Sequence, residues 1–247
     1  MENYDQFINP NDNYFNNILP NIMGNLIDGK FIDKNFPPNN EKTFANKINP
    51  LVDYTKGYLE NIYNQEYNEA IENYRKGIRN NTLVWKRISD IIDVEKDQSR
   101  KIFINQNFLG DCYFIAFLRS LQKFQPNIYF NLFGLCFPEI GYYEIYFFTK
   151  DGKQFKVFVD DYILVKNDNK DLRAYCASLK KGDIFTVGRS LLIEKAFAKI
   201  NGSYFNITGG FEGIHPAKAL LGFDPIILNK EDIKKKSLFY IMNLKMM

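Results

Sequence analysis

The 247-residue sequence predicts an α+β fold, and three patterns along the chain support this prediction. Two stretches rich in aromatic and β-branched residues, 142–150 and 153–161, flank Asp151-Gly152, a dipeptide that is a strong signal for a β-hairpin. Segments with helical spacing of apolar residues, 112–124 and 189–204, precede and follow this hairpin. Helices, then a hairpin, then helices is an order typical of α+β proteins.

The chain begins with a polar, asparagine-rich segment. Residues 1–24 have no basic start and no apolar run, so we expect a flexible polar tail and no secretory signal. Paired prolines in "NFPPNNEKTF", residues 35–44, predict an extended or turn conformation. From 53 to 79, tyrosines and apolar residues at helical spacing lie among many charges, which predicts a surface helix.

The helix predicted over 112–124 is apolar on almost all sides, so we expect it in the protein interior. Gly110 and Asp111 supply its start. Glycine serves as a turn residue, and the exposed N–H groups of a first helical turn favour an acidic residue.

The elements after the hairpin are predicted from shorter signals. Residues 162–165, "YILV", are expected to add a third strand. The helix over 189–204 should stop at Asn201-Gly202, and a short helix should begin at Pro216. We interpret Asp160 and Asp161 as a strand end and its turn rather than a paired-carboxylate site.

The composition excludes several protein classes. The chain is 45% hydrophobic with 23 Phe and 16 Tyr, which is too aromatic for a disordered protein. The 32 basic and 29 acidic residues give a net charge of +3, so no strong attraction to nucleic acid or membrane surfaces is expected. No stretch approaches the ~20 apolar residues that a membrane-spanning helix needs.

Three cysteines, Cys112, Cys136 and Cys176, are scattered along the chain without metal-ligand spacing. An odd number of scattered cysteines favours free thiols in a reducing compartment, so a cytoplasmic location is expected. These residues predict neither a metal site nor a cofactor.

Cys112 stands at the predicted start of a helix, which is where a thiolate forms most easily. A thiolate is the nucleophile of acyl-transfer chemistry. Gln106 precedes it by six residues, and an amide aimed at the same point as a backbone N–H forms an oxyanion hole. The alternative is that Cys112 is a small buried core residue, because cysteine is often buried. The residues alone leave both interpretations open.

Five segments, in order, resemble those of the calpain-type cysteine peptidases of the papain-like superfamily. They are "FIDKNFPPNN", "VWKRISDI", "QNFLGDCYFIAFLRSL", "QFKVFVDDYIL" and "LLIEKAFAKINGSYFNITGG". The third is similar to the family's nucleophile segment, Q-x-x-L-G-D-C-W-F-L-A-A. Together the five segments cover residues ~28 to ~224.

The resemblance implies a papain-like fold and the N-terminal half of a peptidase core. We therefore expect a nucleophile-bearing subdomain with a central buried helix and a small antiparallel sheet, over residues 25–228. Residues 229–247 would begin a linker to a missing second subdomain.

The resemblance also implies peptide-bond hydrolysis and assigns residues to it. Cys112 would be the nucleophile, Gln106 the oxyanion-hole side chain, and Gly210 the glycine whose backbone pairs with a peptide substrate. From the residues alone, Gly210 is interpreted as a residue of an ordinary turn. The implied partner is a protein or peptide substrate.

The family's catalytic histidine and asparagine segments, of G-H-A-Y and N-P-W-G type, do not occur in these 247 residues. The single histidine, His215, precedes a proline near a predicted helix start, and we expect a capping or surface residue. The chain alone is therefore expected to be inactive, unless a second polypeptide supplies the missing half of the site.

Two further departures concern calcium and aromatic positions. In the family, an Asp and a Glu ligate calcium in this half of the core, and Phe103 and Val187 stand at the matching positions here. Calcium binding of the family type is therefore doubtful. Tyr113 replaces the tryptophan that follows the family's nucleophile, and Arg189 replaces a second tryptophan.

Three functions thus stay in competition. The first is a truncated or half-core calpain-type endopeptidase. The second is a non-catalytic calpain-like module that binds peptides or regulates a partner. The third is a redox-sensing thiol at Cys112, because an accessible cysteine of low pKa is prone to oxidation.

Overall fold

The computed structural model describes most of the chain, and every structural statement concerns the described residues alone. These are residues 13–45, 63–91, 103–106, 108–168, 171–174, 178–180, 184–208 and 214–223. The helices are α1 (Asn13–Met23), α2 (Glu41–Phe44), α3 (Tyr63–Arg79), α4 (Cys112–Phe124), α5 (Pro126–Asn131), α6 (Ile184–Ile200) and α7 (Ile214–Leu221), with the 3-10 turns η1 (Ile88–Asp90) and η2 (Phe205–Ile207).

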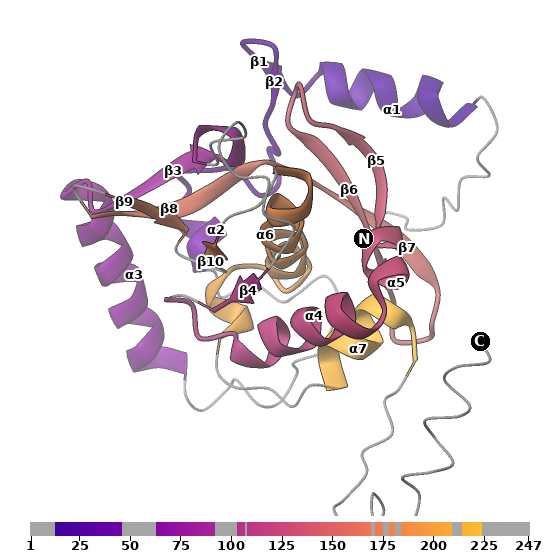
Figure 1. The fold of residues 1–247 in the computed structure, drawn as a ribbon. Helices are drawn as coiled ribbons and strands as arrows, with labels where there is room; N and C mark the ends of the chain where they lie inside the picture. The colour runs from indigo at the N-terminus through magenta and orange to yellow at the C-terminus, as the bar shows by residue number, and fades with distance from the viewer. Residues whose placement is uncertain are drawn as a thin grey trace, which may run out of the picture.

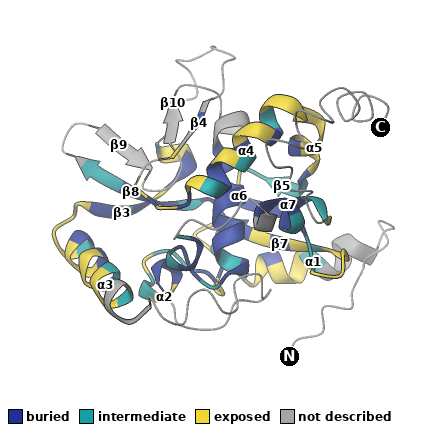
Figure 2. Cartoon of the chain, turned by 90° about the horizontal axis from the view of Figure 1, so that it is seen from below, coloured by how far each residue is buried: buried dark blue, intermediate teal, exposed yellow. Residues whose placement is uncertain are grey.

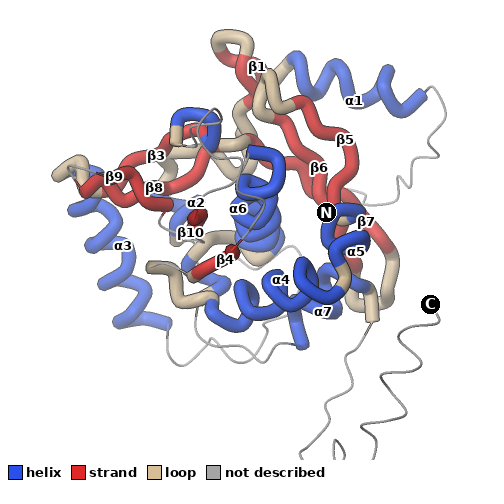
Figure 3. The backbone as a smooth tube through the Cα atoms, viewed as in Figure 1, coloured by secondary structure: helices blue, strands red, loops and turns tan. Residues whose placement is uncertain are grey.

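The strands of the described residues pair antiparallel throughout. They are β1 (Leu26–Ile27), β2 (Lys30–Phe31), β3 (Leu83–Arg87), β4 (Phe103–Asn105), β5 (Phe133–Phe137), β6 (Tyr142–Phe148), β7 (Gln154–Asp160), β8 (Tyr162–Asp168), β9 (Asp171–Ala174) and β10 (Ser178–Lys180). Two three-stranded sheets have the orders β5-β6-β7 and β3-β8-β9, and β1-β2 and β4-β10 form short pairs. This mixture of helices and small antiparallel sheets confirms the predicted α+β class (Figure 3).

The predicted hairpin is present as β6 and β7. Their register runs from Tyr142 opposite Asp160 to Phe148 opposite Gln154, and Gly152 takes a φ of 76° in the turn. A positive φ suits glycine because it has no Cβ to clash with the backbone. The "YILV" segment also forms a strand, but β8 joins β3 and β9 instead of extending the hairpin sheet.

Helix α6 lies at the centre of the molecule, between the two three-stranded sheets (Figure 1). Every residue from 190 to 198 is buried, as the dark colour of this helix shows (Figure 2). The sequence pattern predicted an interior position for α4. That prediction is wrong for one face, because Arg119, Ser120 and Lys123 lie exposed on α4, whose polar residues share one side.

Helices α4 and α6 meet through an aromatic pair. The buried rings of Phe114 and Phe197 stack with centroids 4.2 Å apart and planes 11° apart. Aromatic side chains bury large apolar areas, and stacked pairs add a further ~1 kcal/mol. The pair therefore fixes the first turns of α4 against the central helix.

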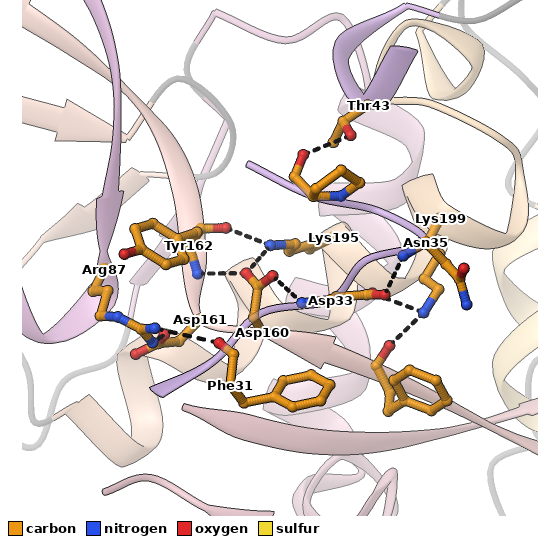
Figure 4. A network of polar contacts seen from close by, with 12 residues as sticks. Phe31, Asp33, Asn35, Thr43, Arg87, Asp160, Asp161, Tyr162, Lys195 and Lys199 are labelled. Carbon is orange, nitrogen blue, oxygen red and sulfur yellow. Dashed lines mark hydrogen bonds and ion pairs between the residues drawn. The ribbon is translucent and has the colours of Figure 1, made fainter. Parts of the chain in front are cut away.

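A network of buried ion pairs ties α6 to the rest of the fold (Figure 4). Lys195, fully buried, donates to Asp160 Oδ1 at 2.5 Å and to the Tyr162 carbonyl at 2.6 Å. Asp160 also accepts from the backbone N–H groups of Asp33 at 2.8 Å and Tyr162 at 2.9 Å. One carboxylate thus joins the N-terminal segment, the end of β7 and α6.

Two further pairs complete this network. Arg87 bonds Asp161 and donates to the Phe31 carbonyl at 3.2 Å, and Lys199 bonds Asp33 at 2.7 Å. Burial raises the pKa of Asp161, and the Arg87 charge opposes that rise. The expectation that Asp160 and Asp161 form a strand end and its turn agrees with β7 ending at Asp160, and both carboxylates serve as ion-pair partners.

Part of the N-terminal segment that the sequence predicts to be a flexible polar tail is helical. Residues 13–23 form α1, whose Ile18 and Ile22 pack on a cluster containing Phe31 and Tyr142. Isoleucines four residues apart lie on one helical face, so Ile18 and Ile22 can dock the helix together. Residues 1–12 lie outside the described residues.

Other local predictions are met with shifted boundaries. The surface helix appears as α3 from residue 63, and 53–62 lie outside the described residues. α6 stops before Gly202, whose φ is 91°, and α7 starts two residues before Pro216. Within the described ranges, no helix is long and apolar enough to cross a membrane.

Candidate active site

The candidate nucleophile lies at the start of a helix, as the sequence predicts. Cys112 is the first residue of α4, and its thiol is free and exposed. The first N–H groups of a helix have no intrahelical acceptor, and they give this end a partial positive charge. The interpretation of Cys112 as a buried core residue is therefore wrong. An exposed thiol at a helix N-terminus can attack a carbonyl carbon.

Gln106 lies at the other end of the short loop that joins β4 to α4. Its Nε2 donates to the carbonyl of Leu109 at 2.6 Å, and Leu109 itself is buried. This bond anchors the side chain to its own loop and orients the amide. An amide nitrogen carries two hydrogens, so one such bond still leaves a second donor for a ligand.

Asp111 has a different environment from the one predicted. It is the N-cap residue of α4, but its side chain makes no capping bond to the helix. The carboxyl is completely buried, and no N–H group or hydroxyl of another described residue donates to either oxygen. Burial raises the pKa of Asp111 to about 6, although hydrogen bonds with Glu194 and with the Asp111 backbone oppose the rise.

Glu194 reaches this carboxyl from the central helix α6, and it is also completely buried. Sequence reasoning missed it as a partner of the candidate site. The available signal was an acidic residue within an almost wholly apolar helix, because buried carboxylates are rare unless they are paired.

Tyr113 follows the candidate nucleophile and packs partly buried against the core. Burial raises the pKa of its phenol, and negative charge on Asp111 and Cys112 raises it further. Tyr113 is therefore a neutral aromatic support for the first turn of α4.

One predicted site residue, Gly210, and the side chain of the single histidine lie outside what the structure describes. Gly210 lies outside the described residues, so its predicted role stays a prediction. His215 lies in α7, which packs against α4 and β6, but the position of its side chain is not described.

The positions that bear on calcium lie on two elements. Phe103 begins β4, where it pairs with Lys180 of β10, and Val187 lies within α6. Neither side chain carries an oxygen, so neither fits a calcium ion, which takes six to eight oxygen ligands. In the part of the chain that the structure describes, no group of three or more His, Cys, Asp or Glu residues could hold a metal ion.

Comparison with known proteins points to one family. A family model described as calpain family cysteine protease matches residues 31–245. The chain is 33% identical over 134 residues to the calpain-1 catalytic subunit of Rattus norvegicus, an alignment that covers 52% of this chain and 18% of the relative. It is 30% identical over 177 residues to calpain-5 of Mus musculus, covering 65% and 26%.

A third relative is calpain clp-4 of Caenorhabditis elegans, which is 29% identical over 163 residues, covering 62% of this chain and 20% of the relative. The alignments thus span between 18% and 26% of the length of these three curated relatives.

Proposed function

Because this chain belongs to the calpain family of cysteine proteases, we propose that it carries the nucleophile of a calpain-type cysteine endopeptidase, Cys112. The observation that carries the proposal is the exposed, free thiol at the first residue of α4. The substrate would be a protein or peptide.

In the proposed reaction, the Cys112 thiolate attacks a peptide carbonyl carbon and forms a C–S bond, and the carbonyl oxygen takes the negative charge. The Cys112 backbone N–H and the Gln106 amide hold that oxygen. Each donor of this kind is worth roughly 3 kcal/mol in the transition state. The amine then leaves with a proton from an acid–base group, and water hydrolyses the thioester. Gly210 would pair with the substrate backbone.

The acid–base group is the part of this mechanism that these 247 residues do not offer in recognisable form. Their single histidine is His215, and no segment resembles the family's histidine or asparagine segments. A thiolate peptidase needs both a base and a group that orients it. We therefore propose that the chain alone is inactive and that a second polypeptide supplies the base.

We further propose that calcium does not bind here in the manner of the family, since Phe103 and Val187 lack carboxylates. A reducing, cytoplasmic location fits the free thiols of Cys112 and Cys136.

One observation favours a second candidate, a non-catalytic peptide-binding or regulatory module. The Gln106 amide already donates one hydrogen to the Leu109 carbonyl, so that hydrogen is not available to stabilise an oxyanion. Peptide binding without turnover, unchanged in Cys112→Ala, would favour this module over the peptidase.

The proposal is tested with a fluorogenic peptide and the purified chain. We expect no turnover by the chain alone, and we expect site-specific alkylation of Cys112. Turnover that disappears in Cys112→Ala would show that a base is present after all. Equal alkylation of Cys112, Cys136 and Cys176 would refute the nucleophile assignment.

A further inference from the structure

The carboxyl of Asp111 lies in an environment that an ordinary aspartate does not tolerate. It is fully buried, and no N–H group or hydroxyl of another described residue donates a hydrogen bond to either of its oxygens. An isolated carboxylate in such a place would carry a large desolvation penalty. Its backbone, in contrast, is firmly held, because the Asp111 carbonyl accepts from Phe114 N at 2.9 Å and Ile115 N at 3.1 Å.

The group that faces Asp111 is a second carboxyl, from Glu194 of the central helix. Each of these acids precedes a ring of the stacked pair Phe114 and Phe197 by three residues, which is one helical turn. Each acid therefore lies within about one helical turn of the contact between α4 and α6. Two carboxyl groups can hydrogen-bond each other only if one of them carries a proton.

We propose that Asp111 and Glu194 share one proton at neutral pH, in a carboxylic acid–carboxylate hydrogen bond through which Glu194 positions the first turn of α4 and sets the charge beside Cys112. Glu194 is thus a positioning residue, since it acts through Asp111. The proposal rests on the proposed function only in taking Cys112 as the reacting thiol.

The titration of this pair follows from its surroundings. Burial raises the pKa of Asp111 to about 6, and its bond with Glu194 lowers that pKa, as expected if Glu194 is the donor. The pair carries two protons below about pH 6 and one above it. Because the two carboxyl groups are coupled, this loss of a proton is a property of the pair and not of either residue alone. One negative charge therefore appears beside Cys112 as the pH rises through about 6.

Several other titratable groups of the described residues lie on the elements around Asp111. Tyr113, also at the start of α4, stays neutral, because burial and the Asp111 charge raise its pKa. Lys195, next to Glu194 in α6, bonds Asp160. β4 carries no titratable side chain. α7, which packs against α4, brings Lys218 and His215. None of these is among the causes of the Asp111 shift.

The shared proton is observed directly by infrared spectroscopy of the whole chain at pH 7.5. A protonated carboxylic acid gives a C=O stretching band that ionised carboxylates lack, and ordinary carboxyl groups are ionised at this pH. We expect the wild type to show this band, and both Glu194→Gln and Asp111→Asn to lose it. Each substitution keeps the shape of the side chain and replaces a carboxyl group with an amide. The amide N–H then donates in place of the shared proton.

Glu144→Gln is the matched control, since Glu144 is a buried carboxyl that bonds Tyr142 and Lys156 instead. The band should persist in this variant. Absence of the band from the wild type, or its persistence in Glu194→Gln or Asp111→Asn, would overturn the proposal.

The coupling to Cys112 is measured by iodoacetamide alkylation, quantified at that residue by peptide mass spectrometry. At pH 5 the wild-type pair is neutral, and the double variant Asp111→Asn/Glu194→Gln carries no charge there at any pH, so their rates should agree. At pH 7.5 the wild-type pair carries one negative charge, which disfavours the thiolate. The double variant should then react about three- to tenfold faster, as expected for removing one charge a few ångströms away.

A rate ratio that does not change with pH would overturn this coupling. Failure of the proposed function would give a different result. Equal alkylation rates of Cys112 and Cys136 would refute the assignment of Cys112 as the nucleophile, but they would not change the infrared band.

Discussion

Replacing Lys195 with methionine removes the most deeply buried cation of the described network and tests how this fold is held together. In the wild type, Lys195 Nζ lies 2.5 Å from Asp160 Oδ1 and 2.6 Å from the Tyr162 carbonyl oxygen. Methionine has a similar length and fills the same space, so Lys195→Met removes the charge and two hydrogen bonds without opening a large cavity.

The magnitude follows from what the substitution leaves behind. Breaking a buried ion pair by removing one partner costs about 3–5 kcal/mol, because the other charge stays buried. Asp160 keeps its bonds from Asp33 N and Tyr162 N, so we expect a loss near the lower end, about 3 kcal/mol. For a chain of this size, that loss corresponds to a drop in Tm of roughly 6–12 °C.

The assay is urea unfolding followed by circular dichroism, with linear extrapolation to zero denaturant. The control is Arg75→Met, which removes a surface pair with Glu41 whose side chains are 52% and 37% exposed, and which should change stability little. Adding Asp160→Asn to Lys195→Met should recover part of the loss, since it removes the stranded charge. A loss in Lys195→Met no larger than that in Arg75→Met would refute the reasoning.

Three further predictions concern stability. The double variant Asp111→Asn/Glu194→Gln should gain on the wild type by at least about 2 kcal/mol between pH 4 and pH 7, measured by urea unfolding at each pH. An Asp111 pKa raised from 3.8 to about 6 stabilises the fold only at low pH, and that contribution is lost as the pH rises from about 4 through about 6. The proton that the proposed pair retains on Glu194 at neutral pH adds to this loss in the wild type. A difference that does not change with pH would contradict this. Phe114→Ala should cost about 3–5 kcal/mol, since it opens a cavity against Phe197, and Phe114→Leu should cost clearly less. Gly202→Ala should cost about 1–2 kcal/mol, read from the shift in urea midpoint, because φ at this position is 91°; an unchanged midpoint would count against it.

Sequence reasoning located the elements that local signals specify. The β6–β7 hairpin was predicted because Asp151-Gly152 is a turn signal between two strand-like stretches. Its register places Phe148 opposite Gln154, which is one residue off the pairing that a two-residue turn at Asp151-Gly152 would give. α4 was predicted with the bounds it has, 112–124. The stop of α6 before Gly202 follows from the need for a positive φ.

Features set by contacts between distant segments were not predicted. The docking of α1 depends on Phe31 and Tyr142, which lie on two other elements. β8 leaves the hairpin sheet to pair with β3, where Trp85 lies opposite Leu164. Local patterns carry no information about such distant partners, so the sequence analysis interpreted the polar N-terminal segment as a flexible tail.

The same distinction between local features and long-range contacts applies to the candidate site. The position of Cys112 at a helix start is a local property, and the sequence predicted it. The direction of the Asp111 side chain is not local, because it turns toward Glu194 on the central helix instead of capping α4. The sequence therefore predicted an N-terminal acid but not the buried pair that it forms.

The central claim is that Cys112 is a nucleophile presented at the start of α4, and a peptidyl chloromethyl ketone tests it most directly. The folded chain is treated at neutral pH, and adducts are mapped by mass spectrometry at Cys112, Cys136 and Cys176. We predict a single early adduct at Cys112, since Cys136 is half-buried and burial raises the pKa of its thiol. In Cys112→Ala the early adduct should vanish without moving to another cysteine. Adducts that form at the same rate on all three cysteines would contradict the account.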